Sequence, residues 1–128
     1  MAAIGTVTLN IVRDQANANI TVTYSLVGSV FDVTSGQPYR EVCRLIGDDT
    51  DITPPEDNTD DPIPDGVMSN NAVVFPNTTP INRVRTKTLP LANLNEDVGR
   101  DEIRAVVQLT PSLPSTTTRE SNQVTGNF

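Results

Sequence analysis

The chain has 128 residues, a net charge of −7 at pH 7, only five aromatic residues and no His. This length predicts one domain with a modest aliphatic core, and the acidic balance argues against nucleic acid and anionic membranes, because both attract clustered cations. The lack of His, with Cys43 as the single Cys, excludes Ser-His-Asp and Cys-His catalysis, His-ligated metal sites and Cys-ligated clusters.

The first part of the chain alternates apolar and polar residues over 7–12 and again over 19–27. A period of two predicts strands with one buried face, and the polar stretch 13–19 between them predicts an antiparallel hairpin. The inward set of these two strands is Val7, Leu9, Ile11, Ile20, Val22, Tyr24 and Leu26.

The next segment predicts two further strands. Val30, Phe31 and Val33 suggest a short strand, Gly36 and the following proline suggest a turn, and residues 39–46 suggest another strand with two mixed faces. Cys43 lies in this last strand, where we expect it to be a small buried hydrophobe.

An acidic stretch covers 48–66, where eight of nineteen residues are Asp or Glu. Residues 47–71 contain four prolines and no periodicity, so we expect a long loop. Its acidic part, 48–66, is expected to be peripheral to folding, with Ile52 and Ile63 as its only apolar anchors. Calcium prefers such oxygen ligands, but the spacing does not match an EF-hand, and a solvated loop is the alternative. The candidate metal ligands are Asp48, Asp49, Asp51, Asp57, Asp60, Asp61 and Asp65.

A basic row follows, because Arg83, Arg85 and Lys87 fall on one face of a predicted strand. The row is expected either to bind an acidic partner, including the acidic loop of a neighbouring copy, or to have a structural role only. In the structural alternative it is a solvated strand face, or a set of charges that protects an edge strand from pairing. Residues 101–111 form the clearest late strand, whose inward set is Ile103, Ala105, Val107 and Leu109.

The last eighteen residues are rich in Ser, Thr, Asn and Pro. We therefore expect residues 1–110 to form the domain and 111–128 to form a polar tail or extended arm. Leu113, Val124 and Phe128 are its candidate anchors for adding to the sheet edge of a neighbour.

Together these elements predict an all-β fold, an antiparallel β-sandwich of immunoglobulin-like type, with a small barrel or jelly roll as the alternative. The predicted function is a non-enzymatic structural or interaction protein that self-assembles or docks on a larger assembly. A calcium-dependent binding module is the alternative, and a small carboxylate hydrolase is the residual hypothesis.

The expected partner is protein, foremost the chain itself as a homo-oligomer, with no nucleic acid or membrane partner. No cofactor is expected unless calcium binds. The sequence shows no transmembrane stretch and no signal peptide, so the expected location is cytoplasmic, or outside by a route that cannot be read from the sequence.

Overall fold

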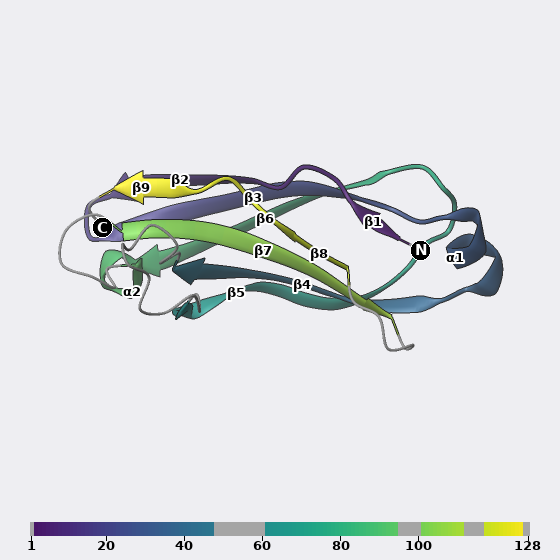
Figure 1. Ribbon diagram of the computed structural model, residues 1–128. Helices are drawn as coiled ribbons and strands as arrows, with labels where there is room; N and C mark the ends of the chain where they lie inside the picture. Colours follow the sequence, from purple (N-terminus) through teal and green to yellow (C-terminus); the bar gives the residue numbers. More distant parts are fainter. Residues whose placement is uncertain (1, 48–60, 95–100, 112–116, 127–128) are drawn as a thin grey trace, which may run out of the picture.

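A computed structural model describes residues 2–47, 61–94, 101–111 and 117–126. These residues form two antiparallel sheets that face each other as a β-sandwich (Figure 1). The all-β sandwich prediction is thereby confirmed, while the immunoglobulin-like subclass stays a prediction. Among the described residues, no helix is long or apolar enough to cross a membrane.

The β3 sheet is built around its longest strand. Strands β1 and β2 lie along one edge of β3, and β6 lies along the other. The register pairs Leu9 with Val22 and Ile11 with Ile20, as the predicted hairpin requires. The strands are β1 (Ala3–Ile4), β2 (Thr8–Asp14), β3 (Asn17–Val27) and β6 (Ile81–Pro90).

The β4 sheet has the order β5-β4-β7-β8, and β9 pairs with β7 beside β8. Between Cys43 and Ile46 the β4–β5 register shifts twice, whereas β4 and β7 pair without interruption. The strands are β4 (Pro38–Gly47), β5 (Asp61–Val74), β7 (Asp101–Pro111), β8 (Thr117–Glu120) and β9 (Val124–Gly126).

The core fills the space between the sheets with the predicted inward side chains. Of the eleven predicted core residues, all are buried except Ile11, which is half-buried and packs against the others. Strand β4 contributes Tyr39, Glu41, Cys43 and Leu45 to this interior. Burial also raises the pKa of the Cys43 thiol to about 12, so Cys43 is the small buried hydrophobe that we expected.

The expected strand at 30–33 is wrong, because the chain forms a short helix there, α1 (Val30–Ser35). The Ser29 side chain accepts from the backbone N–H of Asp32, and the Asp32 carboxylate accepts from the backbone N–H of Ser29. Gly36 ends the helix at φ 67. This capping box outweighs the β-propensity of the Val and Phe residues that follow Ser29.

The acidic stretch is also only partly a loop, because β5 begins at Asp61. Ile63 is 4% exposed and belongs to the core, so the end of this stretch is structural rather than peripheral. Gly66 is needed where β5 bends back toward Ile63, because a Cβ at this position would lie only 2.8 Å from the Ile63 carbonyl oxygen. Ile52 lies outside the described residues.

The structure describes part of the predicted polar tail, including residues 117–126. Its described part does not stand apart as an arm but forms β8 and β9 on the edge of β7. Between them, Ser121 forms a parallel bridge with Val7, and the Asn122 side chain bonds both backbone groups of Leu9. The tail therefore closes one side of the sandwich by joining the β4 sheet to β2.

The second helix, α2 (Leu91–Leu94), follows β6 directly. Its Leu94 is fully buried, and the backbone N–H of Leu91 donates to the Ala16 carbonyl at 2.9 Å. This contact anchors the end of β6 beside the β2–β3 hairpin turn.

Candidate functional site

The predicted basic row lies on the inward side of β6, next to a buried carboxylate from the opposite sheet. Glu41 on β4 is 0% exposed, and its Oε1 lies 3.1 Å from Nη2 of Arg83. Its Oε2 lies 3.2 Å from Nη2 of Arg85 and also accepts a short hydrogen bond from the Tyr24 hydroxyl. The cluster therefore ties β3 and β6 of one sheet to β4 of the other.

Lys87 completes the row but binds a different strand. Its ammonium donates to the carbonyl oxygens of Asp65 and Val67 on β5, at 2.7 and 3.2 Å. These contacts connect β6 to β5 on the side of the sandwich opposite the tail. Three cations thus line the border between the sheets, and among the described residues Glu41 is the carboxylate that pairs with them.

The environment of this cluster raises the pKa of its phenol. Burial and the bond to Glu41 raise the pKa of Tyr24 to about 12, so its hydroxyl stays a neutral donor. Two guanidinium groups and a phenol occupy both oxygens of the carboxylate. Because both oxygens are occupied by groups from the opposite sheet, the cluster is a structural clasp between the two sheets.

The opposite side of the same strands forms a neutral face. The register aligns Thr8, Thr23 and Val84 in one row across β2, β3 and β6. The neighbouring rows contain Asn, Thr, Ser and Val without a charge, and the outward row at the β2–β3 turn, which lies outside this face, contains the carboxylate Asp14. The neutral face comprises Thr8, Asn10, Val12, Asn19, Thr21, Thr23, Ser25, Asn82, Val84, Thr86 and Thr88.

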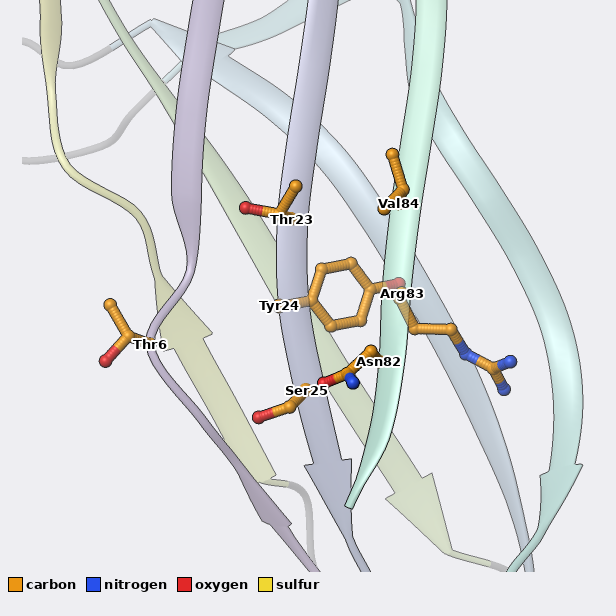
Figure 2. Close-up of a pocket in the computed structure, with 7 residues that line it drawn as sticks. All are labelled: Thr6, Thr23, Tyr24, Ser25, Asn82, Arg83 and Val84. Carbon is orange, nitrogen blue, oxygen red and sulfur yellow. The ribbon is translucent and has the colours of Figure 1, made fainter.

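A shallow hollow of about 460 Å³ opens at one end of the neutral face. Figure 2 shows Thr23 and Ser25 from β3 on one side of it and Asn82 and Val84 from β6 on the other. Thr6, from the link between β1 and β2, lies at its edge, and Tyr24 of β3 and Arg83 of β6 complete the lining. Hydroxyl and amide groups around a shallow opening can hydrogen-bond a neutral polar surface, but they bring no nucleophile and base together.

The other predicted site residues are not gathered here. Val124 lies in β9 and packs against the core, where it pairs with Ile103. Leu113 and Phe128 lie outside the described residues, so their anchoring role stays a prediction.

Most of the predicted calcium ligands are also outside the described residues, namely Asp48, Asp49, Asp51, Asp57 and Asp60. Asp61 begins β5, and the exposed Asp65 has φ 58, a left-handed conformation that Asp tolerates in turns. The described residues contain no group of three or more potential ligands that could hold a metal ion.

Sequence reasoning missed two features of this site. Glu41 lies in a predicted strand with mixed faces, and nothing local indicates that its two arginine partners lie about forty residues downstream. The neutral face has a local signal, because Thr, Asn and Ser occupy the outward positions between the inward apolar residues of β2 and β3.

Comparisons of the chain with protein-family models, with curated proteins and with solved structures found no match.

Proposed function

We propose that this chain is a non-enzymatic structural or interaction protein, which self-assembles or docks on a larger assembly through the neutral face. The observation that carries the proposal is an eleven-residue outward surface without a charge, in a protein whose composition is 20% charged. A charged residue in such a surface would lose its hydration when a partner covers it, so a neutral face costs less to bury.

The two outer faces of the sandwich differ in this respect. The outward positions of the β4 sheet include Arg40, Arg44, Arg104 and Glu120, as an ordinary solvated surface does. The neutral face instead alternates short hydroxyl and amide side chains with Val12 and Val84, which are 53% and 64% exposed. Contact through the neutral face is therefore the approach in which two acidic copies bring the fewest like charges together.

Several side chains that could take part in catalysis are instead occupied by contacts inside the sandwich. Glu41 and Tyr24 are paired inside the sandwich, and Cys43 is fully buried. A second buried carboxylate, Asp32, accepts from the Tyr39 hydroxyl and from Ser29. These four groups are held inside the sandwich, which supports a binding role over catalysis.

The size of the neutral face predicts a weak contact for one pair of copies. Three strands about 4.8 Å apart, each contributing some seven residues of about 3.3 Å, cover roughly 300 Å² per copy. Stable interfaces bury about 800 Å² per partner. We therefore expect reversible association at high concentration, or a stable complex only where several copies bind at once.

Sedimentation velocity from micromolar to millimolar concentration tests this function. Wild-type protein is expected to associate reversibly, and Thr21→Lys, which places a charge at the centre of the neutral face, is expected to remain monomeric. The matched control is Gln108→Lys, which places the same charge on the outer side of β7 and should associate as wild type does. A wild-type protein that stays monomeric throughout, or equal behaviour of both variants, contradicts self-assembly through this face.

A further inference from the structure

The free edge of β6 is the feature that goes beyond a flat neutral face. Strand β6 pairs with β3 along ten residues without a register shift, and no described residue pairs with its other edge. A long regular edge leaves a row of backbone N–H and C=O groups that can accept another strand.

The other edges of the sandwich are less able to accept a strand. On β2, the Asn122 side chain already bonds both the N–H and the C=O of Leu9, at 2.8 and 3.2 Å. Strand β5 contains Pro62 and Pro64, which lack the N–H donor, and its register with β4 shifts twice. Strand β6 has its prolines only at and beyond its ends, so its edge is better suited to strand addition than those of β2 and β5.

The inward side chains of β6 determine which strand fits. Arg83, Arg85 and Lys87 alternate on the inner side, and Glu41 offsets one of these three charges. The two arginine side chains remain 26% and 24% exposed, so they are accessible from the edge. A strand added beside β6 would place its own alternate side chains about 5 Å from this row.

A second copy of β6 does not satisfy that requirement. Antiparallel self-pairing would bring the cationic row of one copy directly beside that of the other, and like charges opposite each other across strands are destabilising. An acidic residue at every second position would instead pair with the row, while Thr or Val at the intervening positions would extend the neutral face.

We propose that the free edge of β6 binds an extended segment of another protein that carries Asp or Glu at alternate positions, as an added strand of the β3 sheet. This proposal deepens the proposed function, because it names the partner chemistry of the same sheet. Backbone hydrogen bonds would supply affinity, and the cationic row would select the acidic register.

The test uses a synthetic peptide of about the length of β6 in which Glu alternates with Thr and Val. Titration into labelled protein at low salt is followed by fluorescence anisotropy and by amide hydrogen exchange. We expect saturable binding that weakens with added salt, together with new protection of amides in β6. A peptide of identical composition with its Glu residues grouped at one end controls for net charge, and it is expected to bind at least roughly tenfold more weakly.

Two variants locate the binding. Lys87→Gln removes a cation that does not contact Glu41, so the clasp stays intact, and we expect it to weaken peptide binding roughly threefold. Arg119→Gln changes the net charge equally on the exposed strand β8 and is expected to bind as wild type does. Equal loss in both variants would show diffuse charge attraction and overturn the proposal.

The remaining outcomes separate this proposal from the proposed function. Binding without new amide protection in β6, or equal binding of the grouped peptide, overturns strand addition. Protection confined to the unpaired edge of β6, without change on β2 and β3, that rises with protein concentration in the absence of peptide would identify a second copy as the occupant of the edge and also overturn it. Thr21→Lys lies away from this edge, so loss of association in that variant with no peptide binding in wild type leaves the proposed function standing alone.

Discussion

Replacing Glu41 with Gln tests the clasp that holds the two sheets together. The carboxylate is fully buried and contacts Tyr24, Arg83 and Arg85. Gln keeps the shape but removes the charge, and its amide group would place a donor against a guanidinium. Breaking a buried ion pair by removing one partner costs about 3–5 kcal/mol. Because both arginines are about one quarter exposed and can turn toward water, we lower the expected cost to about 2–3 kcal/mol.

Urea denaturation and thermal melts at neutral pH measure this change. For a domain of this size, the expected loss lowers the melting temperature by roughly 6–15 °C. Glu120→Gln is the matched control, since this glutamate is exposed on β8, and its stability should stay within about 0.5 kcal/mol of wild type. A similarly small effect of Glu41→Gln would refute the reasoning, because it would mean that the buried charge and its three partners contribute no net stability.

Three further predictions concern the fold. Val22→Asp and Ile103→Asp should each abolish soluble folding, because both side chains are fully buried and would carry an unpaired charge. The control variant Thr21→Asp, on the outward side of β3, should fold. Normal circular dichroism melts for the two buried variants would disprove the strand register. Asn122→Ala should lower the free energy of unfolding in urea by about 1–2 kcal/mol, because it leaves the N–H and C=O of Leu9 without their described partner. An unchanged urea midpoint would show that the tail does not close the sandwich. Stability should fall as the pH rises from about 10 to 12, because folding raises the pKa of Tyr24 from 10.0 to about 12 and deprotonation then favours the unfolded chain. Tyr24 accounts for about 2 kcal/mol of the loss over this range, so melts at pH 8 and 11 should differ less in Tyr24→Phe than in wild type.

The elements with strict alternation were predictable from sequence. Leu9, Val22 and Val107 all point inward as their period of two indicates, because a shift of one residue would expose every apolar side chain of a strand. The same alternation places the Thr and Asn residues of β2 and β3 outward, so the neutral face follows from the pattern that predicts the core.

The elements that sequence reasoning missed depend on other physics. Helix α1 forms because Ser29 and Asp32 cap each other, a local hydrogen-bond pattern that hydrophobic periodicity does not detect. Strand β5 was hidden by its prolines and polar residues, which an edge strand with bulges tolerates. The clasp depends on Glu41 meeting Arg83 across the sandwich, and a separation of 42 residues leaves no local trace in the sequence.

The most direct test of the central claim is a concentration series of amide chemical shifts on the isotope-labelled wild-type protein. If the neutral face is the interaction surface, shifts should move with protein concentration at Thr21, Thr23 and Thr86 and their neighbours on β2, β3 and β6. Residues on the outer side of the β4 sheet, such as Gln108, should stay constant. Concentration-dependent shifts confined to the β4 sheet, or none up to millimolar concentration, would contradict self-association through the neutral face.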